Sequence, residues 1–208
     1  MDRQSLSALS LMATCIALNA IFGSIIFLLK LPIYLDSIGI MLCALIFPGR
    51  KVHAFAAASA VGVLSYLAGV LWGNASMPLF IGTAIVGAAF GSFVVRPVLI
   101  KDGRIAGGPV PKRTATILGL GIAWGVLAAV ASAPVVVLVF QGVTASGTAF
   151  VIELLQRSGQ QLVNAALLAG FAAEPIDKAL QMFAAVALAR ATPDQFLEYL
   201  GWPRAGNQ

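Results

Sequence analysis

The chain has 208 residues, of which 60% are apolar and 10% are charged, and its formal net charge is +5. Soluble domains are typically about 45–50% apolar and about 25% charged, so this chain has too few polar side chains to cover a surface in water. The composition therefore predicts an integral membrane protein within a lipid bilayer. It argues against a soluble enzyme, a disordered chain and a nucleic-acid partner.

Six apolar segments are candidates for membrane-spanning helices, each of which needs about 20 residues. We expect these spans at 6–29, 36–48, 52–72, 77–95, 114–140 and 175–191. The first is longer than the core of a signal peptide, about 7–15 residues, so we expect it to be retained. The second is short and is bracketed by Pro32 and Pro48, and Pro134 is expected to kink the fifth. The predicted fold is all-α, a single six-transmembrane-helix bundle over residues 1–208.

The region 141–174, before the last predicted span, is more polar than the spans. Its apolar residues fall on one face of a helix: Phe150, Leu154, Leu155 and Leu162. We expect a loop with one or two short helices at the membrane interface. Pro175 suits the first turn of the last helix, where Glu174 and Asp177 would lie at the positive end of the helix dipole. The tail, 192–208, is expected to form a short surface helix.

The basic residues predict the orientation of the chain. With the N-terminus inside, ten of them lie inside: Arg3, Arg50, Lys51, Arg96, Lys101, Arg104, Lys112, Arg113, Arg190 and Arg204. Three lie outside: Lys30, Arg157 and Lys178. Lys and Arg concentrate in cytoplasmic loops, so both termini are predicted to be cytoplasmic in a multi-pass, bacterial-type plasma membrane protein.

Polar and aromatic residues collect on the predicted outer side, in the 30–36 loop, the 72–78 loop and the region before the last span. The candidate substrate-binding residues are Tyr34, Asp36, Trp72, Asn74, Gln160, Asn164, Asp177 and Lys178. Aromatic rings stack on an apolar body, while amides and a charge fix its orientation. The cluster therefore suggests capture of a small solute from outside.

Several of these residues also have purely structural interpretations. Tyr34 and Trp72 suit the aromatic belt at a membrane interface. Asp36 precedes an apolar run, which favours an N-cap role for it. Asn74 suits a turn.

The charged residues near the last span have similar alternatives. Glu153 and Arg157 are spaced i, i+4 and are expected to pair on an exposed helix face. Lys178 is followed directly by an apolar span, so we expect it to reach outward or to pair with an acid such as Asp36 or Asp177.

The sequence has no motif for catalysis. It contains no P-loop, no H-E-x-x-H and no G-x-S-x-G elbow with a partnered histidine, and its only histidine is His53. Cys15 and Cys43 are isolated in apolar segments, so no metal site and no cofactor is predicted. We expect a chain that is not an enzyme and that needs another chain to supply energy.

Together these features resemble the substrate-binding membrane subunit, or S component, of energy-coupling factor transporters, which are ABC importers of vitamins. The resemblance covers about 5–190 and has four parts. They are Ala13-x-x-x-Ala17 in the first helix, the 31–39 segment leading into a short second helix, the 174–178 segment, and the plan of about six helices with both termini inside.

The resemblance implies a subunit that binds a vitamin-like micronutrient near the outer face, in a pocket covered by outer loops. Ala13 and Ala17 would dock a transmembrane scaffold subunit, and two cytoplasmic ATPase subunits would hydrolyse ATP. The alternatives are a membrane sensor or scaffold protein that acts through helix contacts and, less favoured, a small membrane-embedded enzyme.

Overall fold

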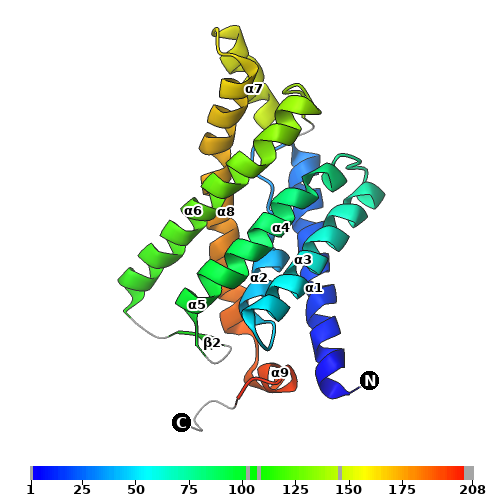
Figure 1. The fold of residues 1–208 in the computed structure, drawn as a ribbon, viewed down its shortest axis with the longest axis vertical. Helices are drawn as coiled ribbons and strands as arrows, with labels where there is room; N and C mark the ends of the chain where they lie inside the picture. Colours follow the sequence, from blue (N-terminus) through cyan, green and yellow to red (C-terminus); the bar gives the residue numbers. More distant parts are fainter. Residues whose placement is uncertain (1, 102–103, 107–108, 145–146, 204–208) are drawn as a thin grey trace.

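The protein is described here by a computed structural model, which covers residues 2–101, 104–106, 109–144 and 147–203 (Figure 1). The longer helices are α1 (Arg3–Leu29), α2 (Ile38–Ile46), α3 (Lys51–Ala68), α4 (Ile81–Phe90), α6 (Val110–Leu138), α7 (Thr148–Arg157) and α8 (Leu162–Ala191). The shorter elements are η1 (Gly69–Trp72), η2 (Met77–Phe80), the π-helical turn η3 (Gly91–Val95), α5 (Arg96–Leu99) and α9 (Asp194–Tyr199). Strands β1 (Ile100–Lys101) and β2 (Arg104–Ile105) form an antiparallel hairpin that pairs Ile100 with Ile105.

The helical architecture agrees with the predicted all-α fold. Within the described part of the chain, four helices are long and apolar enough to cross a membrane: Arg3–Leu29, Lys51–Leu71, Met77–Leu99 and Val110–Leu138. They coincide with the predicted spans at 6–29, 52–72, 77–95 and 114–140. These helices are consistent with a membrane protein.

The second predicted span is a short helix in the middle of the bundle. α2 has 9 residues, and every one of them is buried. At about 1.5 Å per residue a helix of this length covers less than half of the hydrocarbon thickness of about 30 Å. α2 packs against α1, α3 and α8.

The start of the last helix differs from the prediction. α8 begins at Leu162, well before 175, and Pro175 lies inside it, not at its first turn. Residues 162–173 are rich in alanine and leucine, which favour a helix, and Ala165, Ala166 and Ala169 pack on Ile152 of α7. The expected interfacial helix before the last span is therefore α7 alone, and Glu174, Asp177 and Lys178 lie in the middle of α8.

Close glycine contacts join the helices around α2 and α8. A Cβ atom on Gly125 of α6 would overlap the backbone of Glu174 and Pro175, and one on Gly39 of α2 would overlap the Cys15 carbonyl of α1. Asn19 of α1 accepts a hydrogen bond from the Gly39 N–H at 2.6 Å and donates one to Ser65 of α3 at 3.0 Å. These contacts fix the helices that carry the cavity described below.

The start of α1 and α9 lie at one end of the bundle, and α7 lies at the other (Figure 1). α9 confirms the short helix predicted in the tail. It packs through Leu197 and Leu200, and the Trp202 indole N–H donates to the Ile46 carbonyl at 2.9 Å. Arg104 of the hairpin pairs with Asp194 at 2.8 Å. The C-terminal segment therefore covers the end of α2.

The α6–α8 contact is tested by Gly125→Ala. The added methyl group would collide with backbone atoms, which cannot rotate away, so we expect a loss of about 1–3 kcal/mol in the free energy of unfolding. The measurement is the thermal unfolding midpoint of the purified protein in detergent. Gly119→Ala is the matched control, because a Cβ at Gly119 of the same helix meets nothing within 4 Å. Equal midpoints for the two variants would contradict this packing.

Candidate functional site

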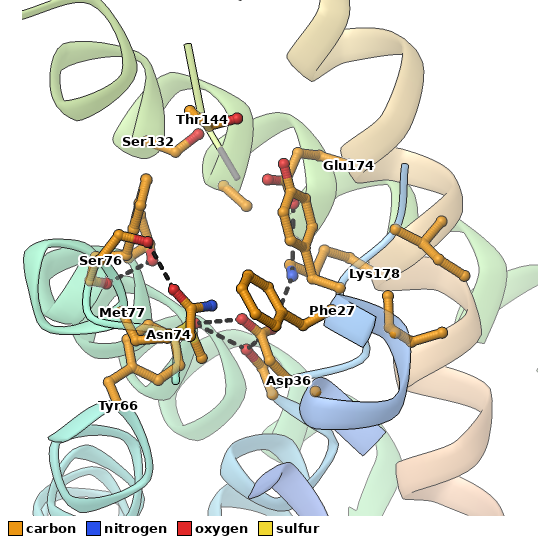
Figure 2. Close-up of a pocket in the computed structure, with 18 of the residues that line it drawn as sticks. Phe27, Asp36, Tyr66, Asn74, Ser76, Met77, Ser132, Thr144, Glu174 and Lys178 are labelled. Carbon is orange, nitrogen blue, oxygen red and sulfur yellow. Dashed lines mark hydrogen bonds and ion pairs between the residues drawn. The ribbon is translucent and has the colours of Figure 1, made fainter. Parts of the chain in front are cut away.

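A cavity of about 110 Å³ lies between the last turns of α1, the second half of α6 and the middle of α8 (Figure 2). Its aromatic lining residues are Phe27, Tyr34, Tyr66, Phe80 and Trp124. Its polar lining includes Ser37, Asn74, Ser76, Thr83, Ser132 and Thr144, and its charged lining is Lys30, Asp36, Glu174 and Lys178. A cavity with aromatic walls and a few convergent polar groups is the usual form of a small-molecule site.

Four charged side chains, which we name the Lys178 cluster, meet at the base of this cavity. They are Lys178, Asp36, Glu174 and Asp177. The Lys178 ammonium lies 2.7 Å from Asp177, 3.5 Å from Glu174 and 3.6 Å from Asp36. It also lies over the rings of Tyr34 and Trp124, at 5.6 Å and 5.5 Å from their centroids. Of the two alternatives expected for Lys178, the structure shows pairing with an acid and not a side chain that reaches outward.

Asp36 lies in this cluster and does not cap α2. The N-cap residue is Ser37, which makes no side-chain capping bond. The Asp36 carboxylate instead accepts hydrogen bonds from the Tyr66 hydroxyl at 3.1 Å and the Ser37 hydroxyl at 2.9 Å. The neighbouring Lys178 charge and two hydroxyl donors hold the carboxylate away from the helix start.

Asp177 lies beneath the cavity and holds the 30–36 loop in place. Its side chain is fully buried and accepts hydrogen bonds from the backbone N–H groups of Tyr34 at 2.9 Å and Leu35 at 3.0 Å. The Gln181 amide donates to it at 2.7 Å. Leu35 has a positive φ of 48°, a strained conformation for a leucine, and these bonds stabilise it. The loop geometry at the cavity therefore depends on one buried carboxylate.

Two lining residues, Tyr34 and Asn74, form side-chain hydrogen bonds that order the segments around the cavity. The hydroxyls of Tyr34 and Thr148 are 3.1 Å apart, which links the 30–36 loop to the start of α7. Asn74 accepts a hydrogen bond from Ser76 at 2.7 Å, so it has the turn role considered above and also lines the cavity. Segments far apart in the chain thus close around one space, as Figure 2 shows.

The predicted substrate-binding residues separate into three groups. Tyr34, Asp36, Asn74 and Lys178 line the cavity, and Asp177 supports it from below. Gln160 and Asn164 are exposed and do not line it. Asn164 faces outward on α8, and Gln160 lies between α7 and α8. The side chain of Trp72 lies outside the described residues.

Two other predicted features are visible on the outside of the bundle. Glu153 and Arg157 pair with each other at 2.6 Å on the exposed side of α7, as predicted. Ala13 and Ala17 are both exposed on α1, while Leu11 and Cys15 face the core.

Sequence reasoning did not single out several cavity residues inside the apolar segments, among them Tyr66 and Trp124. Tyr66 lies in α3 and Trp124 in α6, and both are buried. The same reasoning also missed Glu174, to which it gave only a place at the start of the last helix. A hydroxyl or an indole N–H in the middle of an apolar span needs a polar partner, and that requirement is the signal that could have singled out Tyr66 and Trp124.

Comparison with protein-family models, with curated proteins and with solved structures finds no match to this chain.

The supporting role of Asp177 is tested by Asp177→Ala. The substitution leaves two backbone N–H groups and the Lys178 ammonium without their closest acceptor, so we expect a loss of about 3 kcal/mol or more in the free energy of unfolding. The measurement is thermal unfolding in detergent. Asp194→Ala is the control, because Asp194 is paired but 61% exposed, and we expect it to cost about 1 kcal/mol or less. An Asp177→Ala protein as stable as wild type would contradict the role given to Asp177.

Proposed function

We propose that the protein is the substrate-specific S component of an energy-coupling factor type importer. In this role it captures a vitamin-like small molecule at the outer face of the plasma membrane. It delivers the molecule inward when coupled to a transmembrane scaffold subunit and cytoplasmic ATPase subunits. The observation that carries the proposal is the cavity with aromatic walls and the Lys178 cluster at its base.

The proposed topology has six crossings and both termini in the cytoplasm. The 30–36 loop with α2 forms the second crossing and α8 the sixth. The charges in the middle of α8 support its place in the membrane, because Glu174, Asp177 and Lys178 are all buried and turned into the bundle. Ionisable groups at membrane depth typically face the protein interior and pair there. Most of the basic residues then lie at the cytoplasmic end, opposite the cavity.

The exposed face of α1 supports docking to a scaffold subunit. Ala13 and Ala17 present small side chains there, between the larger exposed side chains of Leu9 and Ile21. Small residues spaced by four let another helix approach closely within a membrane. The chain carries no P-loop of its own, so the proposal assigns ATP hydrolysis to the partner subunits.

The cavity favours solute capture over a sensor or scaffold role that depends on helix contacts alone. A protein that acts only through its outer helix faces has no need of a cavity that holds four charged side chains at its base. Two carboxylates of the Lys178 cluster, Asp177 and Asp36, are committed to Lys178, the 30–36 loop and Tyr66. They therefore give more support to a binding site than to a membrane-embedded enzyme.

The proposal is tested by purifying the chain from its own host in mild detergent. We expect native mass spectrometry to detect a retained small molecule, and peptide analysis to detect a membrane scaffold and subunits with P-loops. Ala17→Trp should reduce the co-purified ATPase by about tenfold or more while the small molecule is retained, because the indole blocks close helix approach.

Ala123→Trp is the matched control, since Ala123 is an exposed alanine on a different helix, α6. It should keep both the ATPase and the small molecule. Wild-type protein that carries no small molecule and no ATPase would contradict the proposal. ATPase binding that survives Ala17→Trp would contradict the docking face.

A further inference from the structure

The Lys178 cluster holds more negative than positive charge. Three carboxylates, those of Asp36, Glu174 and Asp177, surround one ammonium, so in their ionised forms the formal sum is −3 + 1 = −2. The shortest contact of Lys178, at 2.7 Å, goes to Asp177, which does not line the cavity. The two carboxylates that do line it are the more distant ones, Asp36 and Glu174. When all three carboxylates are ionised, the surplus negative charge therefore faces the cavity.

Glu174 is the least satisfied member of the cluster. The residue is only 7% exposed, and its Oε2 atom accepts no hydrogen bond from any described residue. In Figure 2 its side chain points into the cavity beside Lys178. Among the described residues, the one cation near this oxygen is the Lys178 ammonium at 3.5 Å, which two other carboxylates share. A buried carboxylate oxygen without a hydrogen-bond donor is costly. A donor or a positive charge that enters from the cavity would complete its contacts.

Lys178 is poorly placed to receive an anion. Its ammonium already contacts three carboxylates and lies over two aromatic rings. A carboxylate that approached it from the cavity would also approach Asp36 and Glu174. The other cation in the lining, Lys30, is exposed. Water and salt screen an exposed charge far more than a buried one, so Lys30 does not offset the charge at the base.

The walls suit the body of a cationic solute. Phe27, Tyr34, Tyr66 and Phe80 all line the space in front of the two carboxylates. Aromatic faces attract a positive group within about 6 Å of the ring centroid and also pack against an apolar body. The ring pair of Phe80 and Phe140, stacked at 5.9 Å, stiffens one wall.

Building on the proposed importer role, we propose that the cavity selects solutes that carry a positive charge on an aromatic or apolar body, and that it rejects carboxylate solutes. The charge would be a protonated amine, an amidine or a cationic ring nitrogen. It sits against Glu174 and Asp36, where it gives the Glu174 Oε2 atom a hydrogen-bond donor or a close positive charge and reduces the formal charge of the cluster.

The test identifies the solute that the full-length protein retains when it is purified from its own host. Native mass spectrometry detects the bound mass, and chromatography with mass spectrometry of the released compound gives its structure and its charge at neutral pH. Stripped protein is also titrated with probes of defined charge while its thermal unfolding is followed. The probes are choline and thiamine as cations, riboflavin as a neutral compound, and biotin and pantothenate as anions.

We expect a cationic retained solute, and stabilisation by at least one cationic probe but by neither anion. Glu174→Gln should weaken binding of the retained solute by about 30-fold or more, because it removes one partner of a buried charge pair. The unfolding midpoint of the stripped Glu174→Gln protein should change little, since Oε2 accepts no hydrogen bond and Lys178 keeps its closest partner, Asp177, at 2.7 Å. Glu153→Gln on the exposed side of α7 is the matched control and should bind like wild type.

A neutral or anionic retained solute would overturn this inference and leave the importer role standing. Binding unchanged by Glu174→Gln would overturn it as well. A protein that retains no solute, responds to no probe and carries no ATPase subunit would instead remove the proposed function, and this inference with it. The charge of the retained solute does not depend on any variant, so poor folding of Glu174→Gln would not obscure the result.

Discussion

The contact between Lys178 and Asp177 is the interaction on which the site depends. An ammonium and a carboxylate that are buried 2.7 Å apart have to compensate each other, because burial has removed most of their water. Asp177 also accepts the backbone N–H groups of Tyr34 and Leu35, so the same carboxylate fixes the path of the 30–36 loop. One buried pair thus connects α8, the loop and the base of the cavity.

The surrounding helices provide the space and the rigidity for that pair. Gly125 lets α6 approach the backbone of α8 at Pro175, directly beside the charged residues. Asn19 joins α1 to α2 and α3 through side-chain hydrogen bonds, which keeps Asp36 and Tyr66 within reach of each other. Charges in the middle of an apolar bundle are rare because they are costly, and they are usually retained for function. The Lys178 cluster fits that expectation.

Composition and hydropathy predict the helical plan well because long apolar segments have few alternatives in a bilayer. The spans at 6–29, 52–72, 77–95 and 114–140 match helices of the structure. The predicted start of the last helix, at 175, is wrong because a proline usually marks the first turn of a helix, whereas Pro175 lies within α8. Pro175 is accommodated inside α8, where α6 packs against it. The sequence around Pro175 does not reveal this contact between α6 and α8.

The sequence singles out some of the residues that line the cavity. The loop residues Tyr34, Asp36 and Asn74 stand out as polar or aromatic groups between apolar spans, and they line the cavity together with Lys178. Gln160 and Asn164 also stand out as polar, but both are exposed. Polarity alone does not tell which way a side chain points. Tyr66 and Trp124 were missed because they lie within spans, where only the folded bundle brings them beside Asp36 and Lys178.

The most direct test of the account is an experimental structure of the protein with the solute that it retains from its own host. The account predicts density for a small molecule in the cavity between Phe27, Asn74 and Glu174, with a polar atom of the solute in hydrogen-bond contact with Glu174. A solute bound elsewhere, or a cavity filled by side chains while the solute is present, would contradict it.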